Sequence, residues 1–470
     1  MQQFKYQQLA KTLKSQIDEN NWQINEKLPS IRVLANNFNV SKISVQKALY
    51  VLEAMDLIYV KPKSGYYVAA RKNIQHINPE IQGISKPTKV DLPEVFYDIM
   101  ERGAAFDIAP QHLNNSQTPS HLLLLNRHIN RALRQTVHEN SLYYSAPSGS
   151  LALRHQISKH YRKRRVDISA DDICITSGCQ NSIFLALTTI CQAGDIVAIE
   201  SPAFYGVLQL LQQLKLKVVE LPSSYTQGVT AEALRAASKQ WHIKACVITA
   251  NFSTPTGALI PSLEKQAIVT VANEENITLI EDDIYGDLSF HSNVEPLKRY
   301  DMQDNVILCS SFSKSLSRDL RIGWIVTNKH YKKIAQMKLV YQLSSSQAIQ
   351  HGLTSFLAEG HFERHLYQYR RTLVKQRDQL IKEVTNHWNI PVKFTVPEGG
   401  LAIWMELPKG VDTFSLYNKA IAEGIVITPG RLFTSADKFS NYFRLSFAHP
   451  TQGHRLKALI RLAELSKESY

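Results

Sequence analysis

Apolar and polar positions in the first 70 residues follow the period of short helices and then that of short strands. The pattern predicts three helices, the second opened by Pro29-Ser30 and the third with Ser41 as its N-cap. Two β-like runs, 57–60 and 66–68, predict a hairpin after the third helix. The predicted buried faces are Tyr6, Leu9, Ala10, Leu13 and Ile17, then Ile31, Leu34, Ala35 and Phe38, then Val45, Ala48, Leu49 and Leu52. Residues 1–70 are therefore expected to form a mainly α-helical winged helix–turn–helix.

The pattern changes after residue 70. Residues 71–93 are polar, contain three prolines and show no sustained periodicity, which predicts an interdomain linker. Residues 94–470 alternate helical patterns with short apolar runs that are rich in β-forming residues. Such alternation predicts an α/β fold around a mostly parallel central sheet. The predicted strands are 173–176, 196–199, 217–221, 245–249, 278–281, 306–310 and 322–326.

Composition excludes several classes of protein. The chain has 470 residues, of which 44% are hydrophobic and 20% charged, so fibrous, collagen-like and wholly disordered proteins are excluded. No apolar run approaches the roughly 18 residues that cross a bilayer, and the polar N-terminus lacks the apolar stretch of a secretory signal. The five cysteines form no Cys-x-x-Cys pair, which indicates reduced thiols. We expect a cytoplasmic protein that does not contact a membrane.

Positive charge is concentrated near the N-terminus. The chain has a net charge of +13, and residues 1–72 hold 11 lysines and arginines against 5 acidic residues. A small basic domain in front of a nearly balanced body indicates binding to a polyanion. On charge alone, a basic surface without any partner is an equal alternative.

The third predicted helix is the part of a helix–turn–helix that enters the major groove of DNA. Val45 faces the core, which leaves four polar residues of this helix facing outward: Lys42, Ser44, Gln46 and Lys47. Lysine and glutamine suit base edges or phosphates, and serine suits phosphates. Arg32 is placed for a phosphate or a guanine. Gly65 allows close backbone approach at the hairpin tip, beside Lys61 and Lys63. The alternative is a solvated helix face with incidental lysines.

Three motifs in this region occur together in one known family. They are Leu-Pro-Ser-x-Arg-x-Leu-Ala at 28–35, the Val-Ser turn that follows, and Ser-Gly-Tyr-Tyr-Val at 64–68. With them, residues 4–69 resemble the DNA-binding domain of the GntR family of bacterial transcription regulators. The resemblance implies contacts to double-stranded DNA by Arg32, Lys42, Ser44 and Gln46. The family commonly has Arg and Thr where this chain has Lys42 and Ile43, so we do not expect its operator to follow from relatives.

The sharpest chemical signal in the body is a lysine that follows an apolar strand. Lys314 ends the run Ser-Ser-Phe-Ser-Lys, and such a lysine can form a Schiff base with an aldehyde when cationic neighbours lower its pKa. Ser311, Ser313 and Arg321 can bind a phosphate, with Arg321 as a two-pronged partner. An aldehyde joined to a phosphate suits pyridoxal 5′-phosphate. The alternatives are a basic surface turn and the Ser-x-x-Lys motif of penicillin-recognising enzymes, which the missing export signal disfavours.

Four other segments carry residues suited to the same cofactor. A carboxylate within 281–283 can pair with the pyridine nitrogen. Tyr285 can hydrogen-bond the ring hydroxyl, and Phe204 can stack on the ring. Residues 176–180 end a strand and open a helix, whose backbone N–H groups can bind a phosphate. Arg444 can bind a substrate carboxylate. Each signal is weak alone, but together and in this order they are strong.

In that order and spacing, residues of about 100–460 resemble class I aminotransferases of the type I pyridoxal phosphate fold. The resemblance implies Lys314 as the Schiff-base lysine, Asp282 at the pyridine nitrogen and Tyr285 at the ring oxygen. Around the phosphate it implies Gly178, Cys179, Ser311, Ser313 and Arg321. It further implies that Phe204 stacks on the ring, that Arg444 binds an amino-acid carboxylate, and that Tyr144 reaches the phosphate of a neighbouring subunit. The type I fold builds its site at a dimer interface, so the resemblance also implies a homodimer.

One position departs from that family. The chain reads Thr254-Pro-Thr-Gly where the family usually reads Asn-Pro-x-Gly, whose asparagine hydrogen-bonds the ring oxygen. Thr254 is shorter, so we expect cofactor binding to survive and transamination to be impaired. Asn251 is expected to be a structural residue at the end of a strand.

No metal site is expected. His361 and His365 have the i, i+4 spacing of a helical metal pair, but no glutamate directly follows the first histidine. With Glu363 and Arg364 beside them, we expect a solvated helix face.

A GntR-type head fused to an aminotransferase-like body resembles the MocR-type subfamily, in which the body senses ligands. The first hypothesis is a pyridoxal phosphate-dependent transcription regulator that responds to an amino acid, an amine or the cofactor itself. The second is an active class I aminotransferase with a secondary DNA head. The third is a DNA-binding protein whose body only dimerises. Lys314, Asp282 and Arg444 do not separate the first two hypotheses, whereas the intact head and Thr254 favour the regulator.

Overall fold

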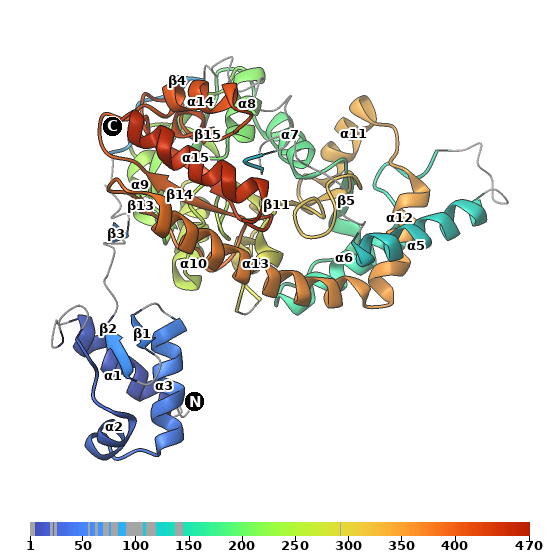
Figure 1. The fold of residues 1–470 in the computed structure, drawn as a ribbon. Coiled ribbons are helices and arrows are strands. Elements are labelled where there is room, and N and C mark those ends of the chain that lie inside the picture. The colour runs from blue at the N-terminus through green and yellow to red at the C-terminus, as the bar shows by residue number, and fades with distance from the viewer. Residues whose placement is uncertain are drawn as a thin grey trace. The chain divides into compact units, whose positions relative to one another are not determined.

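The chain forms two compact units, Met1–Ile74 and Gln75–Tyr470, which we call the head and the body (Figure 1). The structure is a computed structural model that describes residues 5–18, 22, 26–54, 57–61, 64–68, 75–76, 83–90, 107–109, 119–136, 144–291 and 293–470. No helix among these residues is both long enough and apolar enough to cross a membrane. All five cysteines are described, and all are free thiols.

The head is a winged helix–turn–helix, as predicted. Its elements are α1 (Lys5–Asp18), α2 (Ile31–Asn37), α3 (Lys42–Ala54), β1 (Ile58–Lys61) and β2 (Gly65–Val68), with the two strands paired antiparallel. The expected cap at Ser41 is present, since Ser41 Oγ accepts from Ser44 N at 3.1 Å, and Ser30 Oγ likewise accepts from Val33 N at 3.4 Å. These bonds satisfy N–H groups that the first helical turn would otherwise leave unpaired.

The core of the head comes from all of its elements. Leu13 of α1, Leu34 of α2 and Leu49 of α3 are at most 1% exposed. The apolar residues predicted to be buried are confirmed, except that Tyr6, Ile31 and Phe38 remain partly exposed at the rim. Burial of each fully enclosed leucine contributes roughly 1.5–3 kcal/mol. Amphipathic helix faces therefore determine this small domain, as the periodicity predicted.

A nine-stranded sheet forms the centre of the body. Its order is β4-β7-β6-β9-β10-β11-β12-β5, with β8 beside β7. Strands β7, β6, β9, β10 and β11 run parallel, whereas β12 is antiparallel to both of its neighbours. The bounds are β4 (Thr88–Lys89), β5 (Ile173–Thr176), β6 (Ile196–Ser201), β7 (Lys217–Ser224), β8 (Gly228–Val229), β9 (Ile243–Ile248), β10 (Thr278–Asp282), β11 (Val306–Ser311) and β12 (Gly323–Val326). The α/β fold with a mostly parallel sheet is thus confirmed.

Helices cover both faces of this sheet. Along β6, Val197 and Ile199 pack with residues of α7 (Cys179–Ile190) and α8 (Tyr205–Gln213). Between them, Ala198 packs on the opposite face with residues of α9 (Ala231–Ser238) and α10 (Ser262–Glu274). Successive side chains of a strand point to opposite faces, so a strand covered on both sides is apolar throughout. This explains why the strands were visible in the sequence as continuous apolar runs.

Two further groups of elements complete the body. At one end, α5 (Ser120–Thr136), α6 (Leu151–Lys163) and α12 (Gln347–Ala358) pack side by side (Figure 1), with α11 (Tyr331–Tyr341) against α7. A second, five-stranded sheet has the order β15-β16-β14-β13-β3. Its strands are β3 (Gln75–His76), β13 (Lys393–Phe394), β14 (Ala402–Glu406), β15 (Thr428–Pro429) and β16 (Tyr442–Ser446), and its helices are α13 (His361–His387), α14 (Thr413–Ala422) and α15 (His454–Glu468).

The segment predicted to be a linker, 71–93, contains two short strands. Within it, β3 pairs with β13, and β4 pairs with β7 at the edge of the large sheet. Each of these strands has two residues. A two-residue strand carries no periodicity, so only the long-range pairing reveals it.

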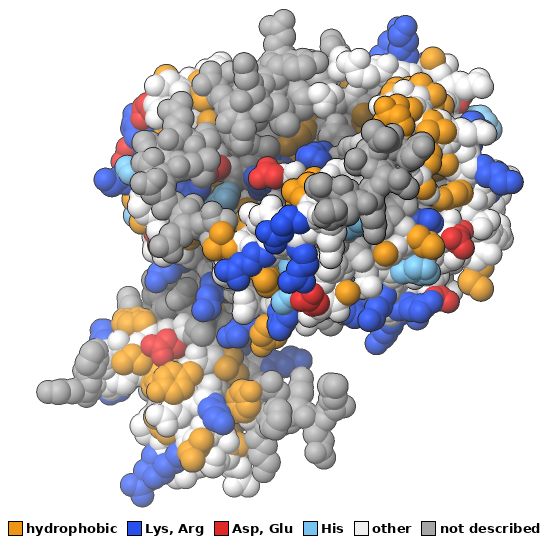
Figure 2. All heavy atoms as spheres, turned by 90° about the vertical axis from the view of Figure 1, so that its right-hand side faces the viewer, with side chains coloured by type: hydrophobic (Ala, Val, Ile, Leu, Met, Phe, Trp, Pro, Cys, Tyr) orange, Lys and Arg blue, Asp and Glu red, His pale blue; other side chains and the backbone are white. Residues whose placement is uncertain are grey.

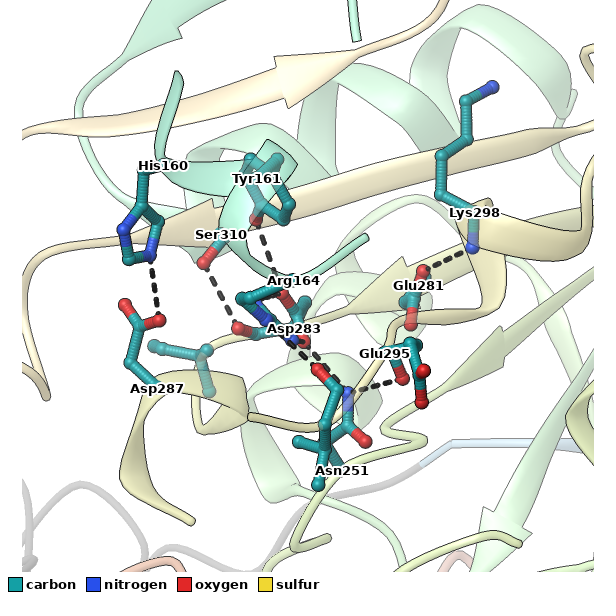
Figure 3. A network of polar contacts seen from close by, with 12 residues as sticks. His160, Tyr161, Arg164, Asn251, Glu281, Asp283, Asp287, Glu295, Lys298 and Ser310 are labelled. Atoms are coloured by element: carbon teal, nitrogen blue, oxygen red, sulfur yellow. Dashed lines mark hydrogen bonds and ion pairs between the residues drawn. The ribbon is translucent and has the colours of Figure 1, made fainter. Parts of the chain in front are cut away.

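A buried ion pair holds the end of β10 in place (Figure 3). Arg164 Nη2 donates to Asp283 Oδ1 at 2.8 Å, and Arg164 Nη1 contacts the other carboxylate oxygen. Tyr161 Oη donates to Asp283 Oδ2 at 3.1 Å, and Asn251 Nδ2 donates to Asp283 Oδ1 at 3.0 Å. Lys265 Nζ in turn donates to Asn251 Oδ1 at 2.6 Å. Asn251 therefore works inside this network, which agrees with the structural role expected for it.

We expect Arg164→Met to lower the free energy of unfolding of the body by about 3–5 kcal/mol, because the Asp283 carboxylate would stay buried without its cation. Both side chains of the pair are at most 3% exposed. Arg162→Met is the control: Arg162, near the end of α6, forms an exposed pair with Asp167, and losing this pair should cost about 0.2–1 kcal/mol. Urea denaturation followed by tryptophan fluorescence measures both losses. Equal losses in the two variants would contradict this role for the buried pair.

Candidate functional site

Lys314 lies directly beyond β11, in the turn that leads to β12. Its side chain is partly buried. Burial, followed by the positive charges of Arg318 and Arg444, holds the pKa of Lys314 well below its usual range, while Asp282 acts in the opposite direction. A lysine in such a field keeps a neutral amine, which is the nucleophilic form.

Three consecutive acidic residues end β10, and the structure gives each a different partner. Glu281 accepts from the backbone N–H groups of residues 297 and 298, at 2.6 and 3.0 Å. Asp283 accepts from Arg164 (Figure 3). Asp282 acts electrostatically on Lys314, where it raises the pKa of the amine. The chemistry of the sequence alone did not decide which carboxylate within 281–283 serves the cofactor. The contacts of the other two now favour Asp282.

Asp282 is 3% exposed and has two hydrogen-bond donors. Cys179 Sγ donates to Asp282 Oδ1 at 3.0 Å, and Ile284 N donates to the same oxygen at 3.2 Å. Burial raises the pKa of Asp282 to about 6, although these two bonds act against the rise. Burial, together with Asp282 itself, raises the pKa of the Cys179 thiol well above its usual range, so the thiol stays a donor. A carboxylate held this way can accept the N–H of a buried pyridinium ring.

The N-terminus of α7 lies beside Arg321. Gly178, just before the helix, has φ +119°, and a Cβ built on it would stand 2.8 Å from Arg321 Nη2. Arg321 Nη2 donates to Ser177 O at 2.7 Å. Beyond β11, Ser311 Oγ accepts from Ser313 N at 3.3 Å. Free helix N–H groups, two serine hydroxyls and a guanidinium are the donors that a phosphate needs.

Arg444 of β16 is 2% exposed and lies among hydroxyls and aromatic rings. Its Nη1 is 3.5 Å from Thr254 Oγ1, and its Nη2 donates to Thr428 Oγ1 at 3.3 Å. Its guanidinium carbon is 5.6 Å from the ring centre of Tyr205. Tyr285 is hydrogen-bonded to Thr254, and burial raises the pKa of its phenol. Thr254 thus joins Tyr285 to Arg444, at the position where the resembling family usually has asparagine.

Two predicted residues lie differently from this group. Phe204, just before α8, is partly buried, and its ring centre is 4.6 Å from that of Tyr205. Tyr144 is 77% exposed, so within one copy of the chain its side chain lies largely in solvent. The predicted contact of Tyr144 therefore requires a second copy.

The structure adds site residues that the sequence did not single out. Arg318 is the largest charge contribution to the low pKa of Lys314, and its only sequence signal is its place four residues later.

His365 corrects the expectation of a solvated helix face. It is 8% exposed, its Nε2 lies 2.9 Å from Ser315 O, and its ring lies against that of His121. This expectation was wrong because charged neighbours in sequence do not report that α13 packs against the Lys314 turn.

In the head, Arg32, Lys42, Gln46 and Lys47 are exposed on α2 and α3. Lys47 Nζ lies 5.8 Å from the ring centre of Tyr6, a contact within the head. The Ser44 hydroxyl is 3.0 Å from Ser41 Oγ, so it belongs to the helix cap. Gly65 has φ +126°, a conformation that favours glycine. Lys63 lies outside the described residues. Arg32, Lys42 and Gln46 are therefore the side chains best placed for DNA.

Comparisons with known proteins match both units. Residues 113–462 match the family "Aminotransferase class I and II", and residues 5–68 match "Bacterial regulatory proteins, gntR family". The chain is 32% identical over 463 residues to the uncharacterized HTH-type transcriptional regulator YjiR of Escherichia coli, covering 98% of each chain. It is 27% identical to the HTH-type transcriptional regulator NorG of Staphylococcus aureus, covering 93% of this chain and 98% of that one.

Solved structures match the body. The kynurenine aminotransferase of Pyrococcus horikoshii, in complex with PMP, is 26% identical, covers 80% of this chain and 95% of its own, and superposes with a TM-score of 0.71. LysN of Thermus thermophilus, an α-aminoadipate aminotransferase complexed with N-(5′-phosphopyridoxyl)-L-leucine, is 24% identical, has the same coverage and also gives a TM-score of 0.71. The type I aminotransferase fold is confirmed.

We expect Gln46→Ala and Lys42→Ala to weaken DNA binding in different ways. Losing a base contact at Gln46 should weaken the binding free energy by about 1–3 kcal/mol and relax sequence preference. Losing a phosphate contact at Lys42 should instead reduce the slope of log binding constant against log salt concentration by about 1. Electrophoretic shifts on a duplex that the parent chain selects from a random library measure both. The control is Lys14→Ala, an exposed lysine of α1. If the control weakens binding as strongly as the other two variants, α3 is not the recognition helix.

We expect Asp282→Asn to stabilise the ligand-free chain at neutral pH. The pKa of Asp282 is about 6 in the folded chain, against about 3.9 in an unfolded one. Between these values only the folded chain holds the proton, so its stability falls as pH rises and the full penalty is reached above about pH 6. The variant, which does not titrate, should be more stable by about 2–3 kcal/mol above about pH 6 and by nothing below about pH 4. Urea unfolding across this range measures the difference; a difference independent of pH would contradict it.

Proposed function

Because this chain belongs to the class I and II aminotransferase family and begins with a GntR-family domain, we propose that its body binds pyridoxal 5′-phosphate and uses it to sense an amino acid or amine. The chain is a transcription regulator with an aminotransferase-like domain. In the proposal, the head binds double-stranded DNA, and the state of the site around Lys314 biases that binding.

One observation carries the proposal. Burial and the charges of Arg318 and Arg444 lower the pKa of the Lys314 amine, and the carboxylate of Asp282 acts on it in the opposite direction. Buried lysines occur elsewhere in the body, but Lys338 donates to backbone and hydroxyl oxygens instead. Strongly shifted groups of opposite type at one position are characteristic of functional sites. The two solved aminotransferases named above are described with pyridoxal-type ligands, which supports the same assignment here.

The residues present fit the cofactor. In the proposal, Lys314 forms the Schiff base, Asp282 pairs with the ring nitrogen and Tyr285 faces the ring oxygen. The phosphate is held by Gly178, Cys179, Ser311, Ser313 and Arg321, and Phe204 stacks on the ring. When bound, the cofactor supplies an electrophilic carbon and an electron sink. The raised pKa of Asp282 suits this role, because a pyridinium beside a buried carboxylate restores the ionised form of both groups.

Arg444 provides a physical route from effector to lysine. An amino-acid carboxylate that binds the Arg444 guanidinium neutralises one of the charges that lower the pKa of Lys314. Effector binding at Arg444 therefore changes the charge beside Lys314. A ligand shifts a conformational equilibrium only through different affinities for two states, and this change of charge supplies such a difference. Thr254, which replaces the usual asparagine beside Tyr285, favours sensing over efficient transamination.

The proposed regulator acts as a homodimer, and two surface features support this. Tyr144 is 77% exposed, which leaves it available to the site of a second copy. Apolar side chains are also exposed on α5 and just at the end of α11, among them Leu133, Val340 and Tyr341, at 48%, 76% and 55%. Figure 2 looks onto the side of the body that carries α5 and α12, and it shows hydrophobic side chains gathered toward one edge. Exposed apolar clusters of this kind mark association surfaces.

We expect the purified chain to show the visible absorbance of a pyridoxal Schiff base, and we expect Lys314→Ala to lose it. Reduction with borohydride, followed by peptide mass spectrometry, should place the cofactor on Lys314. The internal controls are Lys265 and Lys338, two buried lysines whose pKa is also lowered by burial. Labelling at either control would reject Lys314 as the cofactor lysine, and no absorbance after added cofactor would leave only a DNA-binding protein with a structural body.

The same spectrum separates the sensor from the enzyme. Adding a panel of amino acids should shift the absorbance without releasing keto acid, and Arg444→Gln should abolish the shift because the carboxylate loses its partner. Sustained keto-acid production by the parent chain would instead establish the second hypothesis, an active aminotransferase.

A further inference from the structure

Two histidines and a glutamate meet where three helices of the body converge. His128 comes from α5, Glu359 follows the end of α12, and His361 begins α13. The possible ligand atoms of the three side chains lie within 4.8 Å of one another. Glu359 Oε2 is 3.7 Å from His128 Nε2 and 3.1 Å from His361 Nε2. This cluster is separate from His365, whose Nε2 faces Ser315 O.

We propose that His128, Glu359 and His361 bind a divalent transition-metal ion such as Zn²⁺. Tetrahedral zinc with bonds of about 2.0–2.1 Å places neighbouring ligand atoms about 3.3 Å apart. The two measured separations, 3.1 and 3.7 Å, lie on either side of that value. All three ligand atoms lie within 4.8 Å of one another, so the two imidazoles and the carboxylate would close around an entering ion.

The backbone holds these side chains together. Gly360, between Glu359 and His361, has φ +73° and forms the turn that joins α12 to α13. At Gly352 of α12, an added Cβ would stand 2.6 Å from Ile129 Cα, so α5 and α12 approach backbone to backbone one residue from His128. A site built on packed helices needs little reorganisation when an ion enters.

A hydrogen-bond chain sets the tautomer of His128. Ser355 Oγ donates its one hydrogen to Gly352 O at 3.0 Å. The 2.7 Å contact between His128 Nδ1 and Ser355 Oγ is then donated by the histidine. His128 Nε2 consequently carries a lone pair, and it faces the carboxylate of Glu359 at 3.7 Å. Two acceptors turned toward each other are stabilised by a cation between them, and a histidine oriented through its second nitrogen is the usual arrangement of a metal ligand.

The ligand set selects the class of ion. Imidazole nitrogens favour zinc, nickel, copper and cobalt, whereas calcium and magnesium prefer oxygen ligands throughout. The Glu359 side chain is 50% exposed and the His128 side chain 5% exposed, so the site opens to solvent on one side. Water can occupy the remaining coordination position, as it does in three-ligand zinc sites.

Arg364 opposes metal binding, so its removal tests the site. Its Nη2 lies 2.6 Å from His361 Nδ1, and a guanidinium can only donate. His361 Nε2 therefore carries a hydrogen in the metal-free chain and donates it to Glu359. An entering ion must displace that proton and the arginine. Removing Arg364 should consequently tighten metal binding.

The experiment measures binding of Zn²⁺ and Co²⁺ to the tag-free full chain by titration calorimetry and visible absorption. We expect one ion per chain, with the absorption of four- or five-coordinate cobalt. His361→Gln and Glu359→Gln should each weaken binding by at least about tenfold, which is the usual loss on removing one ligand-shell partner. Arg364→Met should strengthen it. The matched control is His351→Gln, an exposed histidine of α12, which should change nothing.

Three results would overturn the proposal. One is the absence of binding at Zn²⁺ concentrations up to about 100 μM, which would mean a binding free energy weaker than about 5.5 kcal/mol. Another is binding that survives His361→Gln. The third is a sulfur-to-cobalt charge-transfer band, which would place the ion on a cysteine. His361→Gln keeps the test valid if a variant of the more buried His128 fails to fold, and the DNA and cofactor experiments are independent of all three outcomes.

Discussion

The buried ion pair between Arg164 and Asp283 is the constraint on which the site of the body depends. Three consecutive carboxylates lie at the end of β10. Arg164 binds that of Asp283, and the backbone N–H groups of residues 297 and 298 bind that of Glu281. Asp282 lies between them and, among the described residues, accepts hydrogen bonds from a thiol and one backbone N–H. Breaking a buried pair of this kind leaves an unpaired charge, so the network cannot be loosened locally. The position of Asp282 relative to Lys314 is therefore fixed by contacts that take no part in the chemistry.

Much of the fold could be read from the sequence, because its elements have strong local signals. The helices of the head have one apolar face each, and the strands at the centre of the body are covered on both sides and read as continuous apolar runs. The turn after β11 stood out because its lysine and small hydroxyl residues directly follow such a run. In each case the information lies within a single helix or strand and the residues next to it.

The features that the sequence did not reveal depend on contacts between distant residues. β3 pairs with β13 more than 300 residues away, and neither strand exceeds two residues. Which member of 281–283 serves the site is decided by Arg164, over 100 positions earlier. His361 and His365 share a helix spacing that indicates a common face, yet one meets His128 and the other meets Ser315. Spacing along one helix says which residues are neighbours, but only the packing of other helices determines what each one touches.

The apolar core of the head is drawn, among the described residues, from the head itself. The stability of that core does not rest on the chemistry around Lys314. Under the proposed function, a mutation that abolishes ligand binding without unfolding the body leaves the DNA-binding surface of the head intact. In a cell that carries both alleles, such copies compete with intact ones for the same operators. Loss of function in the body would then be inherited as a dominant trait, whereas loss of the head would be recessive.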